Sequence, residues 1–355
     1  MKSRVAAAMM VTLACATIAS GQGRDVSQML AAVRAALGGD TIATVKAITA
    51  VGRTLRTGPG GNTTESDFEM AMQLPDKYLM RSVMVSMGNM SVYRNTGFNG
   101  GQVIEEIDRP PNLQGGNIVI RIAGPGGAAM DPAKMTPDQK AEADGLRLHA
   151  NRRDFARLTL GMFAASPAVF PLEFADGGQA ESADGKADVI GVKGPGDFAA
   201  TLFVDAQTHM PLMLSWMDKE PIVITSGPGG PGGPGGPGGP GGPGGPGGTR
   251  VVQQVGGGGT FTSSTTTAGA GGGRNMTKED VEKMQKDFEE RRKDAEAKRR
   301  TVEFRVYYSE YKSVGGVKLP FRIARSIDGK PTEEMLFDTV KLNPKIDPKK
   351  FEASK

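Results

Sequence analysis

The sequence predicts an α+β protein: an antiparallel meander of about eight to ten strands, with one or two helices that cover a face of the sheet. Segments in which apolar and polar residues alternate recur along most of the chain. Turn sequences such as Pro75-Asp76 and Asn99-Gly100-Gly101 separate them, as in an antiparallel meander. Only the N-terminus and one central segment combine helical apolar spacing with helix start or stop signals.

The composition excludes several classes of function. The 355 residues include 51 Gly, 23 Pro, one Cys and two His, with a net charge of +4. One thiol excludes a disulfide scaffold and any zinc or iron–sulfur site with several thiolates, so we expect no cofactor. The charge is small and is not concentrated on one predicted element, and we therefore expect no nucleic-acid partner.

Residues 1–21 have the pattern of a secretory signal peptide. Lys2 and Arg4 precede the apolar run Val5–Ala19, and small residues end the segment, so we expect cleavage near Gly21/Gln22. The alternatives are an uncleaved anchor and lipidation of Cys15. No later run is long enough to cross a bilayer. The sequence thus predicts a periplasmic or secreted protein without a transmembrane span after cleavage.

The first elements follow from spacing. Asp25–Leu37 is predicted as a helix because Met29, Leu30, Val33 and Leu37 share a face and Gly38-Gly39 follows. Thr41–Ala47 is expected to add a second short helical turn. Strands are then predicted at 48–57, 66–74, 77–86, 90–96 and 102–107.

The central part begins with a predicted loop at 109–134, which contains the apolar run 118–122. Thr136-Pro137-Asp138-Gln139 is a capping-box pattern that starts a helix. Later strands are predicted at 187–193, 198–205, 210–217 (continuing at 222–225), 302–311, 317–326 and 332–342.

An insertion interrupts the strands at 226–300. Pro recurs at every third position of the Gly-rich stretch 227–248, which predicts a solvated linker rather than a collagen triple helix. We predict disorder over 226–275 and a charged, exposed helix over 276–300, which is alternatively a docking helix for a partner. Because the flanking strands resemble hairpin partners, 22–225 and 301–355 are predicted to form one domain.

The sequence contains no recognisable set of spaced catalytic residues. His149 and His209 lack spaced partners, and His209 lies in a predicted turn. The adjacent pairs Glu105-Glu106 and Glu333-Glu334 are expected to point to opposite faces of their strands. The sequence therefore predicts a protein that is not an enzyme, the rival interpretation being a secreted hydrolase with an unrecognised site.

The methionine content indicates a function more clearly than the histidines and acidic pairs do, because 16 of the 19 Met lie beyond the leader. Flexible thioethers adapt to irregular ligands, although they also fill cores, and Met84, Met87 and Met90 leave copper(I) as a further alternative. Alternation predicts a ligand cavity lined by Phe68, Met70, Met72, Leu74, Met80 and Met84.

Several short motifs, taken in order, resemble the outer-membrane lipoprotein-sorting (LolA/LolB-like) superfamily of exported proteins. They are Ala36-Leu37-Gly38-Gly39, Leu74-Pro75-Asp76-Lys77-Tyr78, Phe98-Asn99-Gly100-Gly101, Leu202-Phe203-Val204-Asp205 with Thr208-His209-Met210-Pro211, Gly315-Gly316-Val317-Lys318-Leu319-Pro320, and Asn343-Pro344 with Asp347-Pro348 and Phe351. The resemblance covers most of 25–108 and 187–353, whereas the insertion has no counterpart in the carriers.

The resemblance implies a half-barrel with a helix lid over an apolar cavity, and a role in holding the acyl chains of lipoproteins. The predicted function is therefore non-catalytic periplasmic binding of a lipid or lipoprotein acyl chain. The alternative is an envelope sensor or scaffold that contacts an envelope protein through the inserted linker and helix.

Overall fold

The computed structural model describes residues 24–58, 61–87, 90–108, 135–182, 185–226, 251–256, 259–264, 286, 290–291 and 293–352. Twelve strands share one open sheet with the order β5-β4-β3-β2-β1-β15-β14-β13-β9-β8-β7-β6, and β10-β11-β12 form a second sheet. Every strand pair whose register is described is antiparallel. The α+β class is confirmed, with more strands in the main sheet than predicted.

The elements agree closely with the sequence-based boundaries. The helices are α1 (Val26–Leu37), the 3₁₀ helix η1 (Gly39–Thr44), α2 (Pro137–Phe163) and the 3₁₀ helix η4 (Pro348–Phe351). The strands are β1 (Ala47–Thr57), β2 (Thr63–Gln73), β3 (Lys77–Met87), β4 (Met90–Asn99), β5 (Gln102–Asp108), β6 (Glu173–Ser182), β7 (Gly185–Lys193), β8 (Ala199–Asp205), β9 (Pro211–Lys219), β10 (Ile222–Ser226), β11 (Val251–Gly256), β12 (Gly259–Ser264), β13 (Thr301–Val314), β14 (Val317–Ile327) and β15 (Lys330–Leu342).

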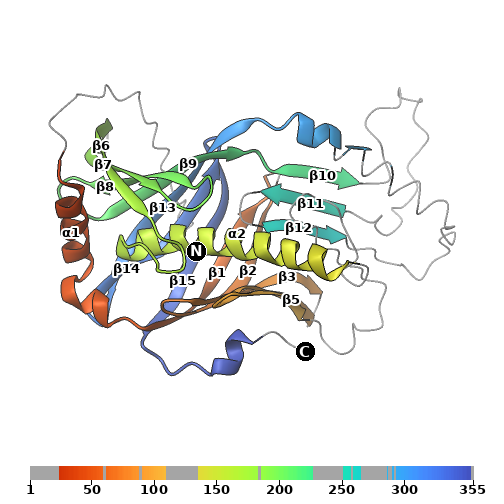
Figure 1. Cartoon of the computed structure of the whole chain (residues 1–355), viewed down its shortest axis with the longest axis horizontal. Coiled ribbons are helices and arrows are strands. Elements are labelled where there is room, and N and C mark those ends of the chain that lie inside the picture. The colour runs from red at the N-terminus through yellow and green to blue at the C-terminus, as the bar shows by residue number, and fades with distance from the viewer. Residues whose placement is uncertain are drawn as a thin grey trace, which may run out of the picture. The chain divides into compact units, whose positions relative to one another are not determined.

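The contacts within the chain define two compact units. Unit 1 comprises residues 1–78, 153–217 and 303–350, and unit 2 comprises residues 79–152, 218–302 and 351–355. In unit 1, β1, β15, β14 and β13 run side by side, and each contributes buried apolar side chains to the core (Figure 1). Unit 1 therefore contains the part of the sheet on which a candidate site can be described.

Helix α1 forms as its sequence predicts. The Asp25 carboxylate caps the N-terminus of α1 by accepting a hydrogen bond from the Ser27 backbone N–H at 2.8 Å. The helix ends at Leu37, and Gly38 is its C-cap. Its stripe of Leu30, Val33 and Leu37 is buried. The apolar stripe thus determines which side of α1 faces the protein, because burial of apolar area is the main favourable contribution to the free energy of folding.

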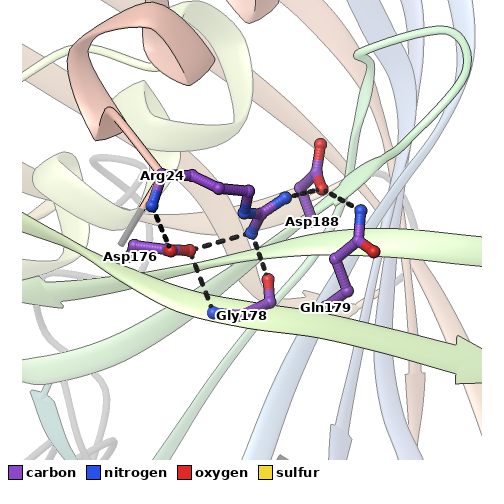
Figure 2. Close-up of polar contacts among 5 residues, drawn as sticks. All are labelled: Arg24, Asp176, Gly178, Gln179 and Asp188. Atoms are coloured by element: carbon purple, nitrogen blue, oxygen red, sulfur yellow. Dashed lines mark hydrogen bonds and ion pairs between the residues drawn. The ribbon is translucent and has the colours of Figure 1, made fainter. Parts of the chain in front are cut away.

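Arg24, which precedes the N-cap of α1, joins this end of the helix to the β6–β7 hairpin of unit 1. The Arg24 guanidinium pairs with Asp176 at 2.8 Å and also contacts the Asp188 carboxylate and the Gly178 carbonyl (Figure 2). The Arg24 backbone N–H donates to Asp176 as well, at 2.9 Å. The hydrogen bonds from the Arg24 side chain and from the backbone N–H groups of Gly178 and Arg24 lower the pKa of Asp176 to about 2.

This ion-pair cluster predicts acid-sensitive stability. The folded-state pKa of Asp176 lies below its ordinary value of 3.8, so its contribution is present above that pH and is lost as the pH falls toward 2. We expect Arg24→Gln to lower the free energy of unfolding at pH 7 and to flatten its decline between about pH 4 and pH 2. Urea titrations at several pH values measure both effects.

The exposed Lys186 of the same hairpin provides the control, since it only approaches Glu181 at 3.8 Å. Lys186→Gln should leave both the stability at pH 7 and its acid dependence nearly unchanged. An Arg24→Gln protein with the wild-type pH profile would show that the Arg24–Asp176 pair contributes nothing.

In unit 2 the start of α2 confirms the capping box. Gln139 N–H donates to the Thr136 hydroxyl at 3.3 Å, and the Gln139 side chain accepts from Thr136 N–H at 3.0 Å. Farther along α2, Asn151 donates to the Gly97 carbonyl of β4 and Arg152 to the Gly100 carbonyl of the β4–β5 turn, at 2.9 Å each. The same hairpin buries an ion pair between Arg94 and Glu105. The helix is therefore joined to this hairpin by polar contacts.

Some predictions differ from the structure. Strand β6 was not predicted, because its sequence EFADGGQAES lacks apolar alternation. Strand β10 belongs to the second sheet instead of continuing β9, and β11 and β12 lie within the segment predicted as disordered. Residues 286, 290–291 and 293–297 of the charged segment are helical. The leader, the loop 109–134 and the Gly-Pro repeat lie outside the described residues.

Candidate ligand-binding site

One face of the unit 1 sheet contacts helix α2, and we call it the α2 face. Strand register places its side chains: Gly52 of β1 lies opposite Phe68 of β2 and Phe337 of β15, and Ile323 of β14 lies opposite Tyr308 of β13. The Phe68 and Phe337 rings meet edge to face with centroids 5.2 Å apart. The α2 face thus presents a continuous apolar surface across these strands.

Two tyrosines join the second half of α2 to this face. The Tyr308 hydroxyl donates to the Arg157 carbonyl at 2.9 Å. A left-handed backbone at Glu310, with φ 53°, interrupts the alternation of β13, and the Tyr311 hydroxyl donates to the Pro211 carbonyl at 2.8 Å and lies 3.4 Å from the Gly161 carbonyl. Burial raises the pKa of both phenols above their ordinary value, so they remain neutral donors.

Aromatic stacking adds to this attachment. The Arg157 guanidinium lies 3.9 Å from the centroid of the Trp216 ring and forms an ion pair with Asp154 at 2.9 Å. Trp216 in turn stacks on Phe304 of β13, with ring planes 15° apart. A buried Arg held between an aromatic face and a carboxylate has little freedom. The second half of α2 is therefore held rigidly on the sheet.

A row of charges crosses the polar end of the α2 face. Glu333 of β15 lies directly opposite Arg56 of β1 on one side and Arg325 of β14 on the other. Arg56 Nε lies 2.8 Å from Glu333 Oε2, and Arg325 Nη1 lies 3.5 Å from Glu333 Oε1. The register thus brings together side chains that are remote in the sequence.

Arg325 lies at the polar end of the α2 face and is exposed. Solvent contacts 48% of its side chain. Burial by the surrounding protein is the largest influence on the pKa of Arg325 and lowers it. Glu333, Asp154 and the phenol of Tyr78 act in the opposite direction and leave the pKa raised. Glu333 and Asp154 thus stabilise the charged guanidinium although its side chain is half exposed.

The neighbours of Arg325 share this environment. Burial, the largest influence, opposes ionisation of Glu333, but Arg325 and Arg56 lower the pKa of its carboxyl below the ordinary value. Burial raises the pKa of Tyr78, whose ring packs against Phe155 of α2 with centroids 5.4 Å apart. Glu333 is therefore ionised and Tyr78 neutral near pH 7.

The sequence-predicted cavity residues divide into three groups. Phe68, Met70 and Met72 share one side of β2, and their exposed fractions are 3%, 1% and 0%. Leu74 lies in the turn after β2 and is half-buried, as is Met80 in β3 of unit 2. Met84 lies in β3, and its side chain is outside the described residues. Lining of a cavity by these six residues remains a prediction.

The charged row was not predicted from the sequence. The prediction that Glu333 and Glu334 point to opposite faces is confirmed, because Glu333 meets Arg325 whereas Glu334 pairs with Arg322. No local signal connects Glu333 to Arg56, which lies 277 positions away. Alternation assigns a side chain to a face, but only strand order determines its neighbours.

His209, one of the two histidines, occupies a turn. His209 lies in the turn after β8 with φ 56°, where the Asp205 carboxylate accepts hydrogen bonds from the residues that precede His209, as expected of a turn. Among the described residues no group of three or more His, Cys, Asp or Glu is placed to hold a metal ion. Within those residues no helix is both long and apolar enough to span a bilayer.

The fold and the α2 face define an α+β protein with an open antiparallel sheet and a packed helix. No family model and no curated protein matches the chain. The chain is similar to a solved DUF1329 family protein from Desulfovibrio piger, with 8% identity and a TM-score of 0.43 over 92% of this chain and 97% of that one.

Two further solved structures carry the family name that the sequence resembles. A LolA superfamily protein from Nitrosomonas europaea is 8% identical, covering 92% of this chain and 96% of that one, with a TM-score of 0.40. A domain from Vibrio parahaemolyticus, named as an outer membrane lipoprotein-sorting protein, is 6% identical, covering 93% and 95%, with a TM-score of 0.37. These similarities concern the fold alone.

Proposed function

We propose that this protein is a non-catalytic periplasmic binding protein that holds a lipid or lipoprotein acyl chain on the α2 face. In this proposal the sheet is the curved half-barrel, α2 is its lid, and Phe68, Met70 and Met72 form the apolar floor. The protein is exported by the leader and needs no cofactor.

The observation that carries the proposal is the α2 face, on which Phe68, Phe337 and Ile323 belong to one apolar surface across β2, β15 and β14. The second half of α2 covers that surface, where the Tyr308 hydroxyl donates to the Arg157 carbonyl at 2.9 Å. An acyl chain is a ligand that gains from such a surface, because each buried CH₂ contributes about 0.8 kcal/mol. The methionines of β2 are suited to chains of irregular shape, since thioethers are flexible and polarizable.

A series of neutral alkanols tests acyl binding without reference to any charged group. The full chain, expressed with its leader and stripped of lipid, is titrated with octanol, decanol and dodecanol against a displaced fluorescent fatty-acid probe. We expect the affinity to rise by up to about fourfold for each added CH₂. Native mass spectrometry of the protein before lipid removal should show bound acyl species.

A matched control separates burial in the site from adsorption to the outside. Val51 of β1 is 46% exposed and lies next to Gly52, so it belongs to the opposite side of the strand. Val51→Asp should leave the chain-length dependence unchanged. An affinity independent of chain length, or a Val51→Asp protein that loses the dependence, would contradict acyl binding on the α2 face.

A further inference from the structure

The end of the leader satisfies the rule for signal-peptide cleavage at two positions, since the rule asks for small residues at the last and third-last positions before the cut. Ala19 and Gly21 satisfy it for a cut before Gln22, and Gly21 and Gly23 satisfy it for a cut before Arg24. The sequence rule therefore does not choose between mature chains that start at Gln22 and at Arg24. The contacts of Arg24 in the folded protein distinguish them.

Two carboxylates of the β6–β7 hairpin face the start of the folded chain. Asp176 and Asp188 both pair with the Arg24 guanidinium, and solvent contacts only 18% and 14% of their side chains. Among the described residues no second cation pairs with either carboxylate, and the Gln179 amide that donates to Asp188 at 2.9 Å is neutral. The neighbouring Asp25 caps α1 and is balanced by the positive end of the helix dipole. One largely buried negative charge thus lacks a cation, which is unfavourable.

The backbone nitrogen of Arg24 points at one of these carboxylates. It lies 2.9 Å from Asp176 Oδ2, while the guanidinium of the same residue lies 2.8 Å from Asp176 Oδ1 (Figure 2). In a chain that continues to Gly23 this nitrogen is an uncharged amide. In a chain that starts at Arg24 it is an ammonium, which keeps a donor for Asp176 and supplies the missing positive charge.

We propose that a signal peptidase removes the leader between Gly23 and Arg24, and that the new α-ammonium of Arg24 forms an ion pair with Asp176. Hydrolysis breaks the Gly23–Arg24 peptide bond with one water, which leaves a carboxylate on Gly23 and a protonated amine on Arg24. The mature protein then starts two residues later than a cut before Gln22 would give. This inference rests on the export that the proposed function includes, and it does not depend on acyl binding.

Secretion of the full chain with its own leader tests the position of the cut. The protein is purified from the periplasm of a Gram-negative host, and intact mass with N-terminal peptide mapping identifies its first residue. We expect the wild-type chain to start at Arg24. Two substitutions by Gln, each of which removes a small residue from one cut, form a matched pair. Ala19→Gln should leave Arg24 as the first residue, whereas Gly23→Gln should give a chain that starts at Gln22.

A wild-type chain that starts at Gln22 overturns the proposed cut. So does an Ala19→Gln precursor that is no longer cut before Arg24. Neither outcome affects acyl binding on the α2 face, which the alkanol series tests separately.

Unfolding of the two mature chains tests the ion pair. The Gly23→Gln chain keeps an amide N–H at Arg24, so it can retain the hydrogen bond to Asp176 but not the charge. An ammonium that is paired in the folded protein stabilises it while charged, and this contribution is lost as the pH rises through the titration of the α-amino group, ordinarily near about pH 8. We expect the wild-type chain to have the higher urea midpoint at pH 7 and the two midpoints to converge near about pH 10.

The pH dependence is specific to the ammonium. The other charged groups around it are the carboxylates of Asp25, Asp176 and Asp188 and the Arg24 guanidinium. Carboxylates and guanidinium groups keep their charge between about pH 7 and pH 10, and both chains contain the same ones. Equal midpoints at pH 7, or a difference that persists unchanged at pH 10, overturns the ion pair between the Arg24 ammonium and Asp176.

Discussion

Replacing Phe68 by Ala is expected to lower the free energy of unfolding by about 3–5 kcal/mol. Phe68 is 3% exposed and its ring meets Phe337 edge to face across β1. The two rings lie two strands apart and meet because Gly52 of β1 stands between them. A Cβ atom at Gly52 would lie 2.9 Å from Phe68 Cε1. Loss of the Phe68 ring therefore leaves a cavity that the backbone of β1 does not fill.

Chemical denaturation of the two proteins measures this loss as a shift of the midpoint. Val51→Ala is the control, since Val51 is exposed on the opposite side of β1, and it should cost less than about 1 kcal/mol. Equal losses in the two variants would show that Phe68 is not part of the core.

Replacing Gly161 by Ala is expected to destabilise the protein by about 1–3 kcal/mol, although Ala normally favours a helix over Gly by about 1 kcal/mol. A Cβ atom at Gly161 would lie 2.1–2.5 Å from three carbons of the Tyr308 ring. Relieving that overlap moves α2 away from β13 and lengthens the hydrogen bond from the Tyr308 hydroxyl to the Arg157 carbonyl, now 2.9 Å. Thermal or urea unfolding measures the loss.

The same helix provides a control of opposite sign. A Cβ atom at Gly145 of α2 meets nothing within 4 Å, so Gly145→Ala should stabilise the protein by about 0.5–1 kcal/mol. Tyr308→Leu in the Gly161→Ala background should recover part of the loss, because it removes the ring that is overlapped. Stabilisation by Gly161→Ala would mean that α2 does not pack closely on Tyr308.

Much of the local structure was predictable from short-range rules. The capping box of Thr136 and Gln139 predicted where α2 begins, and the alternation from Phe68 to Met72 predicted the buried side of β2. The turn at His209 was predicted as well. These features depend on residues within a few positions of one another, so hydrogen-bonding capacity and apolar period are sufficient to place them.

Strand β6 shows where such rules fail. Its sequence is polar and contains Gly177-Gly178, which argues against a strand when read alone. It forms because β7 supplies a partner, and because the Asp176 carboxylate in β6 is paired with Arg24, which lies 152 positions earlier in the sequence. Tertiary pairing here outweighs intrinsic preference.

The sequence by itself determined the class of the fold, the side of each alternating strand that is apolar, and the opposed directions of Glu333 and Glu334. Only the tertiary structure decided that β15 lies between β1 and β14, and hence that Glu333 is shared by Arg56 and Arg325. The physical reason is that alternation is a property of one strand. The neighbours of a strand depend on the pairing and burial of the whole sheet, and the charged row of Arg56, Glu333 and Arg325 is made by that pairing.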